Sequence, residues 1–246
     1  MLIRKVMHPQ WLSNSYLVAD SPGGHGVLVD TGADVAPLLA EAKRSGTRIT
    51  HIINTHRHPD HVAHNRHARD ATGAPILAHE ADAEAIGEVD REVSHDDEVE
   101  SGTLRIRVLH IPGHTAGQIA LVVNGKSLFT GDTLFRHSIG GCLGPGHTTF
   151  ADLRHSLMEV LFRLPHEVSV YPGHTVATRI GEEWDYNPFI RIMRGVDPEG
   201  TTPCLLGGSD GTLILRAADY DGGTKAWVRL PDGTDLIAPG SQVVSP

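Results

Sequence analysis

The segment THRHPDH at residues 55–61 places three histidines and one aspartate within seven positions, directly after an apolar run. Neutral imidazole and carboxylate are ligands that Zn²⁺ and Fe²⁺ take at catalytic sites, where one position stays open for water or substrate. His56 and His58 are one residue apart, so in an extended segment both side chains leave the same face. Asp60 and His61 follow as the chain turns into a helix. The segment could therefore serve two metal ions.

Four further residues share a pattern, since each follows an apolar strand-like run and has a glycine within two positions. In open α/β sheets, functional sites collect outside the carboxyl ends of the strands, so loops of this kind converge in space. Glycine permits a tight turn and a close approach of the backbone. The four residues are Asp30 in VLVDTG, His114 in HIPGHT, Asp132 in LFTGDT and His174 in VYPGHT.

The elements that must position these residues alternate between β-rich and α/β segments. Alternating apolar residues and Gly or Pro turns predict the strands, and Asn124-Gly125 is a strong hairpin signal. Apolar residues at helical spacing predict the helices. The predicted strands are 2–6, 14–20, 26–32, 49–54, 75–79, 104–112, 118–124, 127–131 and 167–173, and the main predicted helices are 34–46, 59–73 and about 149–163.

The texture of the chain changes near residue 195. Beyond it, short strand-like runs alternate with DGG and PDG turns, and there is no histidine or cluster of candidate ligands. We therefore predict two parts, a catalytic domain over residues 1–195 and a small β meander over residues 196–246.

Composition excludes several function classes. A net charge of −9 opposes binding to a phosphate backbone, so nucleic acid is not an expected partner. Two cysteines are too few for a disulfide framework or a thiolate zinc cage. No run of 18 apolar residues and no cleaved leader is evident, so we expect a cytoplasmic protein that makes no membrane contact.

With these residues in place, the sequence resembles the metallo-β-lactamase superfamily, whose HxHxDH signature THRHPDH matches. The resemblance covers about residues 1–195. It implies an α+β fold, an αββα sandwich, here with a small C-terminal β extension. It also implies two metal positions. Matched residue by residue, His56, His58 and His114 would hold the first ion, Asp60, His61 and His174 the second, and Asp132 would bridge them.

Within that superfamily the chain is most similar to glyoxalase II (hydroxyacylglutathione hydrolase), because of GDTLF at 131–135 and YPGHTVATRIGEEWDYNPF at 171–189. It departs from glyoxalase II in two places. Glyoxalase II enzymes share a basic residue after the GDTLF turn, which holds the glutathione carboxylate. This chain has Gly141 and Cys142 there instead. The β meander stands where they have a helical C-terminal domain.

The resemblance implies a binuclear metallo-hydrolase in which a metal-bridged hydroxide attacks a thioester or related activated acyl small molecule. Two divalent ions are expected, with Zn²⁺ favoured over Fe or Mn. Asp60 and Asp132 are the expected catalytic carboxylates. Asp30 is expected to orient a ligand such as His56 or His58, although a plain turn aspartate is an equal alternative.

Three other functions remain open at this stage. The first is an iron-dependent persulfide dioxygenase, whose resemblance implies one iron held by His56, His114 and Asp132. The second is a lactonase-type hydrolase. The third is a metal-filled binding module without turnover. The C-terminal meander could cover one rim of the site or form a contact in a homo-oligomer.

Overall fold

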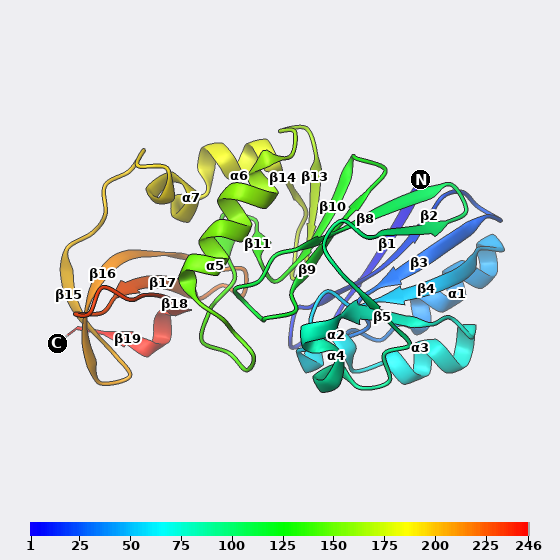
Figure 1. Ribbon diagram of the computed structural model, residues 1–246, viewed down its shortest axis with the longest axis horizontal. Helices are drawn as coiled ribbons and strands as arrows, with labels where there is room; N and C mark the ends of the chain where they lie inside the picture. The colour runs from blue at the N-terminus through cyan, green and yellow to red at the C-terminus, as the bar shows by residue number, and fades with distance from the viewer. Residues whose placement is uncertain (246) are drawn as a thin grey trace.

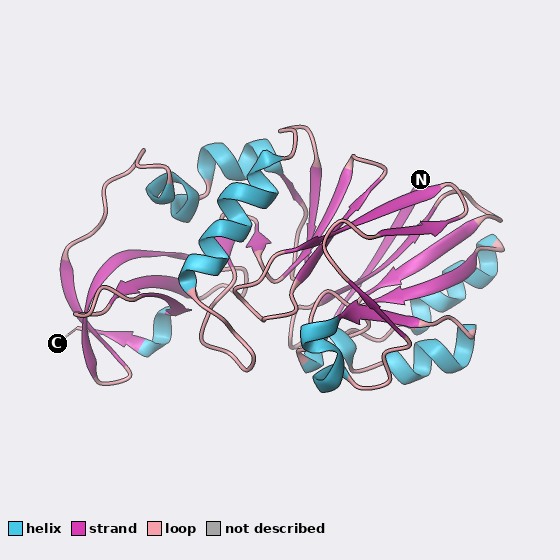
Figure 2. Ribbon diagram, viewed as in Figure 1, coloured by secondary structure: helices cyan, strands magenta, loops and turns pink. Residues whose placement is uncertain are grey.

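Two six-stranded β-sheets pack face to face and carry helices on their outer faces (Figures 1 and 2). The computed structural model describes residues 1–245. Apolar residues from both sheets fill the space between them, including Val29, Val108 and Phe129. This arrangement confirms the predicted αββα sandwich.

The first sheet begins as an antiparallel meander and continues as parallel strands. Its outer face is covered by α1 (Ala36–Ser45) and α3 (Asn65–Thr72) through a second apolar cluster. The crossover through α1 makes β3 (His25–Val29) and β4 (Arg48–Ile53) parallel neighbours, so both strands end at the same edge. In spatial order the strands are β1 (Leu2–Met7), β2 (Asn14–Ala19), β3 (His25–Val29), β4 (Arg48–Ile53), β5 (Ile76–His79) and β6 (Arg91–Val93).

In the second sheet the Asn124-Gly125 turn joins β9 (Ile119–Val123) to β10 (Ser127–Gly131) as predicted, with positive φ at both residues. Its outer face packs against α5 (Phe150–His155) and α7 (Pro188–Met193), and α6 (Ile180–Tyr186) precedes α7. In spatial order the strands are β14 (Thr178–Arg179), β13 (Ser169–Pro172), β10 (Ser127–Gly131), β9 (Ile119–Val123), β8 (Leu104–His110) and β7 (Glu98–Ser101). A short ribbon of β11 (Leu134–Phe135) and β12 (Ser138–Ile139) follows β10.

Two predicted helices differ from those in the structure. The helix expected over 59–73 is divided into α2 (Pro59–Val62) and α3. At the break, the amide and the ring Nδ1 of His64 both lie within hydrogen-bond distance of the Thr31 carbonyl oxygen, which draws the backbone out of helical geometry. The helix expected over 149–163 begins as α5, then loosens into a π-helical turn at Ser156–Val160 and a 3-10 turn at Leu161–Arg163.

The predicted C-terminal β extension is confirmed as a five-stranded antiparallel sheet, which lies at the left of Figure 1. It is not isolated from the sandwich, because Ile214, Trp227 and Ile237 belong to the same apolar cluster as α5 and α7. In spatial order the strands are β18 (Asp235–Pro239), β17 (Thr224–Arg229), β16 (Ser209–Ala218), β15 (Thr202–Leu206) and β19 (Val243–Val244). Along residues 1–245, no helix combines the length and apolarity needed to cross a bilayer.

Candidate metal centre

Three of the predicted ligands meet at the end of the sandwich where β4 and β8 terminate. His56 Nε2 lies 3.0 Å from His58 Nδ1, and His58 Nδ1 lies 2.9 Å from His114 Nε2. These atoms are so placed that one ion could contact all three. Zn–N bonds of about 2.0–2.1 Å in a tetrahedral site would place neighbouring ligand atoms roughly 3.3 Å apart, which is close to these spacings.

A second group lies beside the first. Asp60 Oδ2 is 3.6 Å from His61 Nε2 and 3.5 Å from His174 Nε2. Asp132 stands between the groups: its Oδ1 is 3.3 Å from His61 Nε2, while its Oδ2 is 3.0 Å from His174 Nε2 and 3.6 Å from His114 Nε2. The structure thus brings all seven predicted ligands together.

Three buried atoms of the seven clustered residues have no hydrogen-bond partner within residues 1–245, namely His61 Nε2, Asp132 Oδ1 and His174 Nδ1, and the first two lie 3.3 Å apart. Buried polar atoms are nearly always paired, so an unpaired nitrogen facing an unpaired carboxylate oxygen calls for a further group. A divalent cation fits, because imidazole nitrogen and carboxylate oxygen are the donors it takes. The residues present therefore fit a pair of metal ions.

Backbone carbonyls fix the orientation of two histidines. The carbonyl oxygen of Pro145 lies 2.9 Å from His58 Nε2, and that of Gly141 lies 2.9 Å from His114 Nδ1. A ring nitrogen that donates to a carbonyl leaves the other nitrogen with its lone pair toward the cluster. In the sequence, Gly141 stands out only because it lacks a basic side chain. That its backbone carbonyl orients His114 could not be predicted from the sequence.

Asp30 was expected to orient a ligand such as His56 or His58, but in the structure it contacts His61. Its Oδ2 lies 2.8 Å from His61 Nδ1 and accepts a 2.8 Å hydrogen bond from the Thr55 hydroxyl, while its Oδ1 accepts one of 2.7 Å from the Thr55 amide. The difference arises because Asp30 follows β3, which neighbours β4, so the carboxylate reaches under the following loop to the third histidine of the motif. Asp30 has a positive φ of 56°, as a few functional-site residues do.

Burial and charge act differently on the ligands in the metal-free protein. Burial lowers the pKa of His114 to about 4 and holds that of His56 well below its ordinary value. Burial also opposes charge on His61, but the carboxylates of Asp132 and Asp30 outweigh it and raise the pKa of His61 well above normal. Burial alone would raise the pKa of Asp132, yet His174 and His61 lower it well below normal.

Close backbone packing supports Asp132 from below. Gly173, just before His174, lies so near that a Cβ there would sit 2.1 Å from Asp132 Oδ1 and 2.8 Å from His61 Cε1. Gly131, just before Asp132, has a φ of 47° that favours glycine. The glycines in the TGD and PGH segments are therefore needed where the strands end against the cluster.

Another group of potential ligands, His137, Glu182 and Glu183, lies outside this cluster. Glu183 accepts hydrogen bonds from the His137 amide at 2.8 Å, the Thr178 hydroxyl at 2.6 Å and the Asn187 amide at 2.8 Å. These hydrogen bonds satisfy both oxygens of the Glu183 carboxylate. Glu183 therefore has a structural role, because it ties the segment after β11 to α6.

The sequence also gave no sign of Tyr220, which lies in the loop between β16 and β17. Its ring stacks on His174, with centroids 4.3 Å apart and planes 18° from parallel. The C-terminal sheet, in which the sequence shows no cluster of candidate ligands, thus reaches a predicted metal ligand. Only long-range packing creates this contact, so local patterning could not reveal it.

Comparison with known proteins agrees with the fold. The model of the metallo-beta-lactamase superfamily matches residues 8–174, and the chain therefore belongs to that superfamily. The match includes all seven clustered residues and stops before the C-terminal sheet.

Three similar proteins place the chain within the superfamily. Hydroxyacylglutathione hydrolase from Rhizobium etli is 39% identical over 228 residues, covering 76% of this chain and 87% of that protein. The crystal structure of ETHE1 from Myxococcus xanthus is 32% identical, with a TM-score of 0.70 and coverage of 80% and 92%. TTHA1623 in a di-iron-bound form is 31% identical, with a TM-score of 0.66 and coverage of 76% and 99%. The protein is a metallo-hydrolase resembling glyoxalase II.

Proposed function

We propose that this enzyme hydrolyses a thioester or a related activated acyl small molecule at a pair of divalent metal ions, with Zn²⁺ as the physiological metal. The observation that carries the proposal is the convergence of seven donor side chains with two buried, unpaired donor atoms at their centre. The proposed ligands of the two metal ions are His56, His58, Asp60, His61, His114, Asp132 and His174. The named relative from Rhizobium etli supports the thioester as substrate.

Bound divalent ions would supply an attacking water of lowered pKa and stabilise the negative charge that develops on the acyl oxygen. The chain's own residues hold and move the proton. The Asp60 side chain is 24% exposed and that of Asp132 only 7%, so Asp60 is the carboxylate nearer the opening. We propose that Asp60 Oδ2 accepts the proton of the attacking water. Asp132 would stay in place between the two groups of metal ligands.

In this reaction a C–O bond forms between water and the acyl carbon, the C–S bond breaks, and the thiolate leaves with the bonding pair. Free thiols ionise near pH 8.5, so a thiolate leaves without a strong general acid. An amine would need one, and none was evident in the sequence. A lactone is the related alternative: its acyl C–O bond would break in place of the C–S bond, and the released alkoxide would take a proton from solvent.

The competing proposal is a persulfide dioxygenase with a single iron held by His56, His114 and Asp132. The similarity to ETHE1 from Myxococcus xanthus keeps this alternative open. The similarity to a di-iron-bound protein also leaves the identity of the metal to be measured.

Metal content per chain separates these proposals. The protein would be purified without added metal and without oxygen, then assayed with panels of thioesters, lactones and persulfides. About two ions per chain with thioester turnover would support the hydrolase. One iron with oxygen uptake on persulfides would replace it, and a fully loaded site without turnover on any panel would indicate a binding module.

A further inference from the structure

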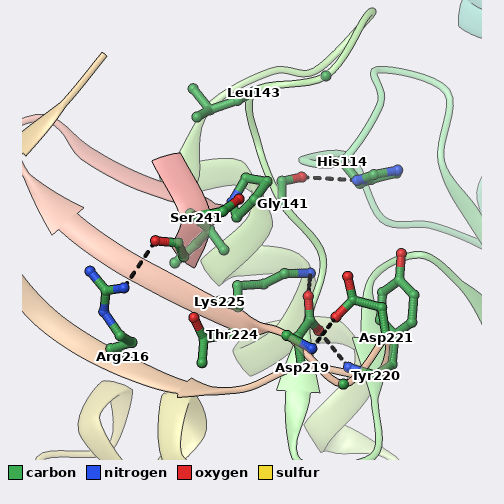
Figure 3. A pocket seen from close by; sticks show the side chains of 16 residues that line it. His114, Gly141, Leu143, Arg216, Asp219, Tyr220, Asp221, Thr224, Lys225 and Ser241 are labelled. Atoms are coloured by element: carbon green, nitrogen blue, oxygen red, sulfur yellow. Dashed lines mark hydrogen bonds and ion pairs between the residues drawn. The ribbon is translucent and has the colours of Figure 1, made fainter. Parts of the chain in front are cut away.

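A cavity of about 650 Å³ opens between the metal-ligand cluster and the C-terminal sheet (Figure 3). His114 lines it on one side. The loop at residues 141–144 and the β16–β17 hairpin line the rest, together with residues at the end of β18. This volume is in the range of small-molecule sites, which often lie between two structural units. The cavity thus adjoins the reacting centre and has the C-terminal sheet as a wall.

Tyr220 is held rigidly in that wall. Besides stacking on His174, its ring packs on Phe135 with centroids 4.8 Å apart. The buried Lys225 pairs with Asp219 at 3.1 Å and donates a 2.9 Å hydrogen bond to the Ile139 carbonyl. This pair ties the hairpin to β12, so the position of Tyr220 relative to the cluster is fixed.

The hydroxyl of Tyr220 is free to bind a ligand. Across residues 1–245 it takes part in no hydrogen bond, although the backbone amide of Tyr220 donates to Asp219. In Figure 3 the phenol oxygen points to the side of the cavity where His114 lies. A phenol hydroxyl is a neutral donor at physiological pH. It is therefore suited to an oxygen that gains negative charge during the reaction.

Arg216 lines the same cavity and lies across it from His114 in Figure 3. Its guanidinium donates hydrogen bonds of 3.0 Å to the Gly240 carbonyl and 2.8 Å to the Val243 carbonyl. These neutral partners fix the side chain without neutralising it, and no carboxylate of residues 1–245 forms an ion pair with it. An oriented guanidinium with unused N–H groups is a binder of carboxylate or phosphate.

We propose that the C-terminal sheet completes the substrate pocket, with the Tyr220 hydroxyl bonded to the acyl oxygen of the substrate and Arg216 bonded to an anionic group on its thiol portion. The inference rests on the proposed thioester hydrolysis and narrows its substrate class. The preferred substrates are thioesters whose thiol portion ends in a carboxylate or a phosphate.

Three thioesters test this, alike except for a carboxylate, a phosphate or a neutral amide at the end of the thiol. In Arg216→Gln the preference in kcat/KM for the anionic compounds over the neutral one should fall roughly 10- to 100-fold, mainly through KM. Arg216→Lys should recover part of it. Tyr220→Phe should lower kcat for all three compounds by roughly tenfold, the effect of one hydrogen bond made in the transition state. The exposed Arg66→Gln is the matched control.

Metal content and thermal midpoint are measured on every variant, so that a folding defect is recognised. Binding of the corresponding thioethers, which cannot be hydrolysed, is measured by calorimetry on the metal-loaded protein. If no thioester is hydrolysed but Arg216→Gln loses affinity for the anionic thioethers, the hydrolysis assignment fails and the pocket stands. If thioesters are hydrolysed and Arg216→Gln treats all three like the unaltered enzyme, the pocket assignment is overturned and hydrolysis stands.

Discussion

Asp132 is the carboxylate that reaches both halves of the cluster, with one oxygen toward His61 and the other toward His174 and His114. Loss of a residue that only hydrogen-bonds to a metal ligand typically weakens metal binding roughly 10- to 100-fold. We expect Asp132→Ala to weaken metal binding by more than this and to abolish nearly all activity. Metal analysis after dialysis measures this, with the exposed Asp70→Ala as control. If Asp132→Ala keeps its metal and its activity, the metallo-hydrolase site is elsewhere.

Asp30 acts on the second metal position through His61. In Asp30→Asn an amide N–H₂ would face donors that now bond to the carboxylate, so the orientation of His61 would be lost. We expect affinity for the second ion to fall roughly 10- to 100-fold while the first ion is retained. Stepwise zinc titration reads out both positions, and Asp34→Asn in the same loop is the control. Equal losses at both positions would contradict this assignment.

The histidines should give the two metal positions different pH dependences. The raised pKa of His61 means that it carries a proton at neutral pH in the metal-free protein, whereas His56 and His114 have lowered pKa values and are neutral there. A metal needs neutral imidazole, so binding beside His61 displaces a proton. Affinity at that position should rise about tenfold per pH unit until the raised pKa is passed.

Calorimetric titrations near pH 6 and pH 7.5, in buffers of different ionisation enthalpy, measure both the affinity and the proton released. The first position should change less. A second position with the same affinity at both pH values, and no proton release, would show that His61 is already neutral.

At the scale of single residues, the seven clustered positions could be chosen from the sequence because each follows a strand or lies in one dense motif. The role of Asp30 could be suspected, but its partner could not, since only the parallel pairing of β3 and β4 brings it under His61. The contribution of Gly141 is a backbone carbonyl, which leaves no trace in residue identity.

At the scale of elements, the end of β13 is packed too closely to admit a side chain. In Gly173→Ala the added methyl group would collide with Asp132 Oδ1 and with the His61 ring, so these groups must separate. We expect loss of metal binding with the overall fold retained, because the disturbance is confined to the strand end. Circular dichroism together with metal analysis tests this, and unchanged metal content would mean that the strand end yields easily.

The strands of both sheets were predictable because alternation and turn residues are local signals. The break at His64 was not, since it depends on a hydrogen bond to Thr31, 33 positions earlier in the chain. The helical spacing of apolar residues predicted one continuous helix through that point. The π-helical turn after α5 is likewise invisible to a periodicity that assumes a regular helix.

At the scale of the whole molecule, the C-terminal sheet shares its apolar cluster with the helices of the sandwich. Trp227 is 3% exposed and packs on Phe150 with ring centroids 4.7 Å apart. Trp227→Ala should therefore destabilise the entire protein by about 3–5 kcal/mol and leave a single unfolding transition. Denaturant unfolding followed by circular dichroism and by fluorescence of the remaining tryptophans measures this.

If the sheet unfolds first and alone, the two predicted parts, residues 1–195 and 196–246, are independent folding units. A shared transition means instead that a chain ending at 195 would expose Phe150 and its neighbours to water. The sequence showed that the meander exists but not where it packs, because turn signals carry no information about which surface a sheet covers.

The hairpin loop at 219–223 also bears on how this enzyme could be engineered. Every proposed metal ligand precedes residue 175, whereas the Tyr220 wall and Arg216 follow residue 200. A library randomised only within 216–224 would therefore vary the residues proposed to contact the substrate while changing no proposed metal-ligand residue. Ile237 lies outside this range, and its backbone exchanges hydrogen bonds with Cys142 beside the carbonyl that orients His114. Selection from such a library would separate new specificity from loss of the metal.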